Sequence, residues 1–90
     1  MNITIAYYYF NNNHVAFLTK KVEKETDKCY FADRRRYSKD EVGIPLIKYV
    51  SSYPYIELIM IDASEEELRD RLLYGLMIKH TMYGKSEINT

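Results

Sequence analysis

The sequence predicts an α+β fold, in which a small antiparallel β-sheet of about four strands carries a C-terminal amphipathic helix on one face. Two observations predict it. Runs of β-branched and aromatic residues alternate with turn-forming residues through the first two thirds of the chain, and a capped helical pattern occupies the last third. The expected order is β-β-β-α-β-α. We expect residues 1–90 to form one domain, because a chain this short can bury only one core.

The first three strands are predicted from residue type. Residues 3–10 and 14–23 are rich in β-branched and aromatic side chains, and the three asparagines at 11–13 between them favour a hairpin turn. A second turn at 24–27 leads to a short third strand at 28–32. Together these segments predict an antiparallel meander.

The segment after the third strand contains one or two helical turns in either of two forms. Ser38 and Glu41 have the spacing of a capping box, which would begin a helix there. Alternatively, a short helix begins with Pro45 in its first turn and runs to about Ser52.

Residues 55–62 form the most apolar strand, and both of its faces are apolar after Glu57, as expected of a strand away from the sheet edge. Ser64 and the three acids that follow it form a capping box. The helix is therefore expected from Glu65 to about Met82, with Gly84 as its stop.

Two apolar stripes run along this helix. One is expected to pack on the sheet and contains Leu72, Leu73, Leu76, Met77, His80 and Tyr83. The other contains Tyr74, Ile78 and Met82. A second stripe predicts either a partner protein or burial under the chain's own loops.

Tyr7, Tyr8, Tyr9 and Phe10 follow one another without interruption. Neighbouring side chains of a strand point to opposite faces, so both faces of the sheet are aromatic here. One helix can cover only one face. The other face is expected to need cover from a second copy, from another protein or from stacked bases.

The composition excludes several classes of protein. Cys29 is the only cysteine, which excludes an internal disulfide and favours a cytoplasmic location. The chain lacks an apolar run near the roughly 20 residues that cross a bilayer, so we expect no membrane contact. Its formal net charge of zero disfavours a strongly basic duplex binder.

Catalytic and ligand-binding motifs are also absent from the sequence. His14 and His80 have no ligand spacing, and no phosphate loop or nucleophile motif occurs. We therefore expect a protein without enzymatic activity that binds no metal and no cofactor.

Two functional hypotheses remain. The first is a non-enzymatic protein-interaction module that binds a larger protein or itself as a homodimer through a tyrosine-rich surface, and a viral inhibitor of the kind that phages make against host complexes is one form of it. Its partner-binding residues would be Tyr7, Tyr8, Tyr9, Tyr74, Ile78 and Met82. The alternative is a single-stranded nucleic-acid binder that uses sheet tyrosines and an arginine cluster, with Tyr30, Arg34, Arg35 and Arg36 as its residues.

Overall fold

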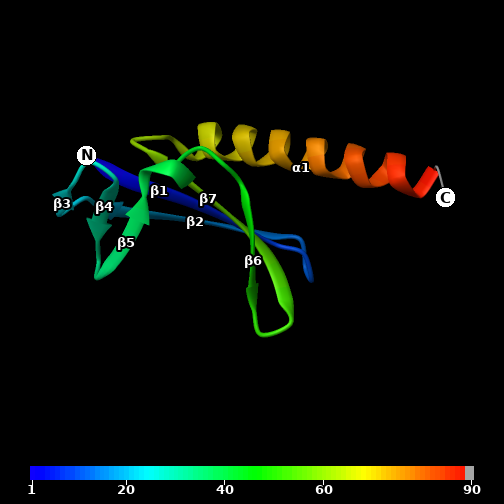
Figure 1. The fold of residues 1–90 in the computed structure, drawn as a ribbon, viewed down its shortest axis with the longest axis horizontal. Coiled ribbons are helices and arrows are strands. Elements are labelled where there is room, and N and C mark those ends of the chain that lie inside the picture. The colour runs from blue at the N-terminus through cyan, green and yellow to red at the C-terminus, as the bar shows by residue number, and fades with distance from the viewer. Residues whose placement is uncertain (89–90) are drawn as a thin grey trace.

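Two antiparallel sheets and one long helix make up the fold (Figure 1). The computed structural model describes the backbone of residues 1–88 and the side chains of residues 1–76. The larger sheet has the strand order β2-β1-β7-β6, and the smaller has the order β3-β4-β5. Helix α1 packs on β1 and β7. The predicted α+β class, with an antiparallel sheet and a C-terminal helix on one face, is confirmed.

The larger sheet is formed by β1 (Asn2–Tyr9), β2 (His14–Lys21), β6 (Leu46–Val50) and β7 (Tyr53–Ile61). The first hairpin and the central position of β7 agree with the sequence prediction. The segment at 45–52 does not, because it contains β6 rather than a short helix. Ser51, at a φ of 55°, turns the chain directly from β6 into β7.

The smaller sheet is formed by β3 (Lys24–Glu25), β4 (Cys29–Ala32) and β5 (Arg35–Ser38). The third predicted strand exists as β4, but it does not extend a meander from β2. After β2 the chain leaves the larger sheet, and β4 pairs with β3 and β5 instead. A 3₁₀ turn, η1 (Lys39–Glu41), follows β5. Ser38 caps it, since its hydroxyl accepts a hydrogen bond from the Asp40 amide at 3.3 Å, so the first of the two predicted forms is the one observed.

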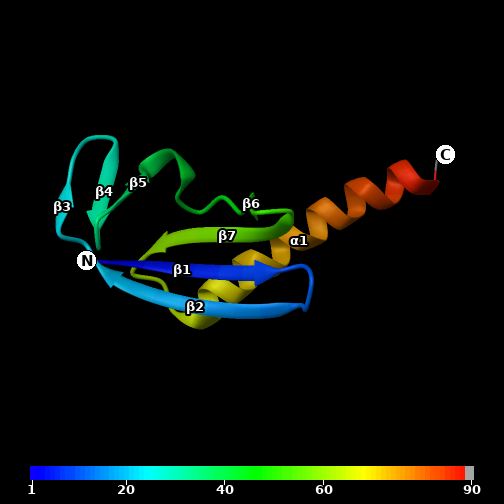
Figure 2. The same cartoon turned by 90° about the horizontal axis from the view of Figure 1, so that it is seen from below.

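Helix α1 (Glu65–Ile88) begins where the capping pattern predicts. The Ser64 hydroxyl accepts a hydrogen bond from the Glu67 amide at 3.1 Å. The predicted stop at Gly84 is wrong, because the helix continues to Ile88. Figures 1 and 2 show its last turns extending past the end of the sheet.

The sheet-facing side of α1 is narrower than predicted. Leu68 and Leu72 are buried and Leu76 packs beside them, so residues four apart lie along the sheet. Leu73 was placed on this side, but it is 52 % exposed because it lies about 100° around the helix from Leu72. Leu68 was missed. Met77, His80 and Tyr83 lie outside the residues whose side chains are described.

Two core clusters lie on opposite faces of the larger sheet. On the α1 side, Ala6, Ile56 and Leu58 pack under the helix. On the other side, Ile3, Ile5 and Ile59 pack against Ala32 and Tyr37 of the smaller sheet. The chain itself therefore covers half of the face that the sequence analysis assigned entirely to a partner. The remaining half of that face carries the candidate site.

Candidate functional site

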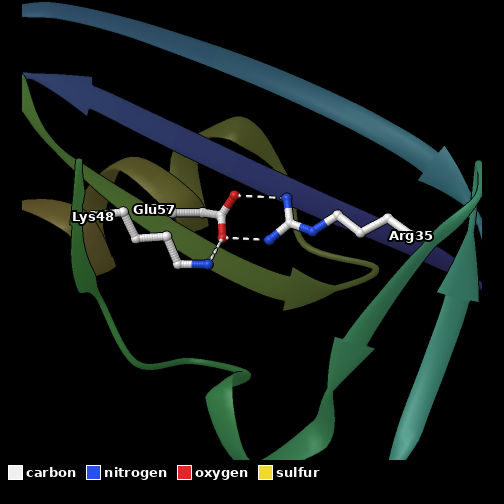
Figure 3. Close-up of polar contacts among 3 residues, drawn as sticks. All are labelled: Arg35, Lys48 and Glu57. Carbon is white, nitrogen blue, oxygen red and sulfur yellow. Dashed lines mark hydrogen bonds and ion pairs between the residues drawn. The ribbon is translucent and has the colours of Figure 1, made fainter. Parts of the chain in front are cut away.

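A buried carboxylate lies where the smaller sheet meets the uncovered half of the larger one. Glu57, in the middle of β7, is only 3 % exposed. Its Oε2 accepts a hydrogen bond from Arg35 Nη1 at 2.9 Å, and its Oε1 accepts bonds from Arg35 Nη2 and Lys48 Nζ at 2.7 Å each. Figure 3 shows the three side chains converging from β5, β6 and β7. We call them the ion triad.

The turn between β4 and β5 positions the Arg35 side chain toward the Glu57 carboxylate. Asp33 and Arg34 both have positive φ, 48° and 65°, which is the geometry of a two-residue hairpin turn of type I′. The strand alternation that follows puts Arg35 on the same side as buried Ala32 and Tyr37. The guanidinium lies 4.5 Å from the centre of the Tyr37 ring, which supports its planar orientation.

The ion triad holds Glu57 in its charged form. Burial alone would raise the pKa of this carboxyl, but the hydrogen bonds and charges of Arg35 and Lys48 outweigh burial and lower the pKa to about 2. The same hydrogen bonds raise the pKa of Arg35 against the opposing effect of its own burial. One carboxylate thus faces two cations, which leaves a surplus positive charge at the site.

Tyr7 lies beside the triad on the neighbouring strand, opposite Glu57 in the β1–β7 register. Burial raises the pKa of Tyr7 to about 12, and the negative charge of Glu57 adds to the effect. A neutral phenol and a carboxylate with both oxygens bonded are poor proton-transfer groups near pH 7.

An aromatic row extends from Tyr7 toward the β1–β2 hairpin and contains Tyr7, Tyr9, His14 and Tyr55. Tyr9 is the middle residue of the row. The centre of its ring lies 6.3 Å from that of Tyr7, 5.9 Å from that of Tyr55 and 6.2 Å from that of His14. Apart from Tyr7, these residues belong to neither core cluster. The row therefore lies outside both cores, on the sheet face opposite α1.

The predicted tyrosine surface is divided between the two faces. Tyr8 lies on the α1 side and packs against the core there, while its hydroxyl donates a hydrogen bond to Asn13 Oδ1 at 2.6 Å. Tyr7 and Tyr9 lie on the opposite face. Three consecutive tyrosines of a strand cannot form one surface, because successive side chains alternate.

Tyr74, predicted to bind a partner, is 59 % exposed on α1. It lines a shallow pocket with Met60, Glu67, Asp70 and Arg71. Ile78 and Met82, predicted to continue this stripe, lie outside the residues whose side chains are described.

The structure does not bring the predicted nucleic-acid residues onto one surface. Arg35 binds Glu57, whereas Arg34 lies at the turn and Arg36 is exposed on the outer side of β5. Tyr30 packs against the core and is covered by the Lys39 ammonium, 4.9 Å from its ring centre. Strand alternation separates Arg35 from Arg36, and the turn keeps Arg34 outside β5.

Lys48, Tyr55 and the triad role of Glu57 were not predicted from the sequence. One signal was available, since Glu57 is the only charge in an otherwise apolar strand and a buried acid requires partners. Lys48 was missed because one of the two predicted forms placed its segment in a short helix and neither placed it in a strand.

In the described part of the chain, no group of side chains has a metal-binding arrangement, and no helix is long and apolar enough to span a membrane. No protein family model, curated protein or solved structure matches this chain.

Proposed function

We propose that this protein is a non-enzymatic interaction module that binds another protein through the aromatic row and the surface beside it. The observation that supports this most directly is that Tyr9, His14 and Tyr55 lie together on a sheet face without belonging to either core. Tyrosine is enriched in protein interfaces because it contributes a large contact area with few rotatable bonds.

The surroundings of the row also support a protein partner. Tyr53 and Val50, at the β6–β7 hairpin beside Tyr55, are large apolar side chains that are more than half exposed. The nearby charges are mostly internal to the triad, where Glu57 binds Arg35 and Lys48. A surface with this much apolar area, whose one surplus positive charge is held within the triad, fits a protein better than a phosphate backbone. An inhibitor of a larger complex is one form that such a module can take.

The test compares capture of partners by three baits from a lysate of the source cell. We expect the wild-type protein to retain a partner that the double variant Tyr9→Ser/Tyr55→Ser loses by at least tenfold. The matched control, Tyr74→Ser, removes an exposed tyrosine on the helix and should retain the partner.

Two outcomes would contradict the proposal. Equal capture by the wild type and the double variant would remove the aromatic row as the contact surface. Capture that disappears after nuclease treatment, together with oligonucleotide binding that weakens steeply with salt, would favour nucleic acid instead.

A further inference from the structure

At the β6 edge of the larger sheet, some backbone groups have no partner among the described residues. In antiparallel strands, the backbone groups of alternate residues bond to alternate neighbours. The bond from the Asp62 amide to the Asn2 carbonyl fixes the even-numbered residues of β7 as partners of β1. The odd-numbered residues of β7 therefore bond to Leu46, Lys48 and Val50. This leaves the N–H and C=O groups of Ile47 and Tyr49 pointing outward.

This edge is also unusually apolar. Tyr49 is 68 % exposed and Ile47 is 37 % exposed. Natural edge strands are commonly protected by charges, bulges or proline. The one charge within β6 is that of Lys48, which is bonded to Glu57, and Pro45 stands just before the strand. In Figure 2, β6 forms the outer border of the sheet on the side away from β2.

The opposite edge, β2, is a weaker candidate. The C-terminal end of β2 contains Lys20 and Lys21, whose charges disfavour pairing with another strand. The Arg69 guanidinium of α1 also lies 5.4 Å from the ring centre of Phe17 in the middle of β2, so the helix covers one side of that edge.

A second copy of the chain fits β6 poorly in the three antiparallel registers that pair Ile47 and Tyr49 with each other or each with itself. Pairing Ile47 with Tyr49 of the other copy puts Lys48 directly opposite itself, and like charges there are destabilising. Pairing Ile47 of one copy with Ile47 of the other puts Tyr49 opposite Pro45 of the other copy, which has no N–H to donate. Pairing Tyr49 of one copy with Tyr49 of the other puts Ile47 opposite Ser51 of the other copy, which lies in the β6–β7 turn and is not extended.

The charge beside the edge indicates what would fit. Lys48 points to the face opposite α1, where it and Arg35 share the single carboxylate of Glu57. A strand added beside β6 would place one of its side chains directly opposite Lys48. A carboxylate at that position would meet the surplus positive charge of the triad.

We propose that β6 is a strand-addition site for an extended segment of another protein, with apolar side chains beside Ile47 and Tyr49 and a carboxylate opposite Lys48. The inference rests on the proposed function, since it names how the module would hold its partner. It predicts up to four backbone hydrogen bonds, from the N–H and C=O groups of these two outward residues.

The experiment titrates the isotopically labelled protein with the blocked peptide Thr-Thr-Val-Glu-Val-Thr-Thr, observed by NMR. We expect the amide signals of Ile47 and Tyr49 to shift and their hydrogen exchange to slow. A peptide with Lys in place of Glu should bind at least about threefold more weakly, because a charge attraction becomes a repulsion. A peptide N-methylated at both valines should bind at least about tenfold more weakly, because it loses two donors.

Two protein variants provide the matched comparison. Tyr49→Pro removes an outward N–H that the β6–β7 ladder does not use, a position where an edge strand accepts proline. Tyr49→Val removes the same ring and keeps the donor. We expect the first to lose peptide binding and the second to keep it. Should Tyr49→Pro not fold, the N-methylated peptide tests the same residue pairs in the wild-type protein through the opposite bonds, in which the peptide N–H groups donate to the Ile47 and Tyr49 carbonyls.

Other results would overturn the inference. They are an absence of shifts at millimolar peptide, shifts confined to β2, equal binding of the Glu and Lys peptides, or protection of the two amides by self-association without peptide. If the inference fails while lysate capture still depends on Tyr9 and Tyr55, the proposed function stands without strand addition. If capture is also independent of those tyrosines, both are wrong.

Discussion

Arg35 and Glu57 join the two sheets through a bidentate ion pair, with N–O distances of 2.9 and 2.7 Å. Arg35 belongs to the small sheet and Glu57 to the central strand of the large one. The pair therefore fixes the position of the smaller sheet over the core cluster that contains Ile3, Ile5 and Ile59. It also sets the boundary between the covered and the uncovered half of the sheet face.

Removing Arg35 should destabilise the protein because the buried Glu57 carboxylate would keep only Lys48 as a donor. We expect Arg35→Ala to lower the free energy of unfolding by about 2–3 kcal/mol. Urea unfolding followed by circular dichroism measures this change. The neighbouring Arg36→Ala, which alters an exposed side chain, should stay within about 0.5 kcal/mol of the wild type. Equal effects of the two substitutions would contradict the structural role of the pair.

Acid should weaken the fold through Glu57. Its pKa is about 2 in the folded protein against an ordinary value of 4.5, so the folded state favours the charged form. The stabilisation is complete above pH 4.5 and is lost as the pH falls through 2. A lowering of the pKa from 4.5 to about 2 corresponds to a contribution of about 3 kcal/mol.

Two measurements check this pH dependence. Carboxyl ¹³C NMR of the wild-type protein should place the Glu57 titration well below those of the exposed glutamates. Urea unfolding between pH 6 and pH 2.5 should show a smaller acid loss for Glu57→Gln than for the wild type. An ordinary Glu57 titration near pH 4.5 would show that the triad does not form in solution.

Gly75 allows α1 to approach the loop before β6. A methyl group at this position would lie 2.6 Å from Pro45 Cγ, which is too close for any real contact. Alanine favours a helix over glycine by about 1 kcal/mol, but the clash should outweigh that gain. We expect Gly75→Ala to lower the free energy of unfolding by about 1 kcal/mol.

A double-mutant cycle separates the two effects. In a Pro45→Ala background, most of the clash is absent, so Gly75→Ala should become neutral or stabilising. If Gly75→Ala stabilises the wild-type protein by the full helix preference, then α1 does not pack on Pro45 in solution.

The parts of the fold that sequence could predict are those with local signals. The first hairpin, the apolar strand β7 and the start of α1 each have residue patterns that decide them within a few positions. Strand β6 lacked such a signal, because its turn is made by Ser51 at positive φ rather than by glycine or asparagine. Residue type alone does not decide that β4 pairs with β5 and not with β2.

The candidate site was less predictable because it depends on contacts between distant segments. Arg35 and Glu57 are 22 positions apart, and although Glu57 stands out as the one charge in its strand, nothing in the sequence indicates which cation it meets. The aromatic row was partly visible in Tyr7 and Tyr9. Tyr55 joins it only because β7 pairs with β1, as the register shows.

The turn before Arg35 provides the last prediction. Arg34 has a φ of 65°, a left-handed conformation that costs an L-residue about 1 kcal/mol or more and glycine little. The pair Asp-Gly is also a preferred sequence for this turn. Arg34→Gly should therefore stabilise the protein by about 0.5 kcal/mol, even after the greater chain entropy of glycine in the unfolded state.

Arg36→Gly is the matched control because it removes the same charge two positions later. Arg36 lies within β5, where glycine loses strand packing and backbone entropy, so this substitution should destabilise by roughly 0.5–1 kcal/mol. Opposite signs in urea unfolding at the same salt concentration would support the two-residue turn. Equal destabilisation by both substitutions would indicate that Arg34 has an ordinary right-handed backbone conformation in solution. It would then contradict the two-residue turn, which sets the strand alternation that directs Arg35 toward Glu57.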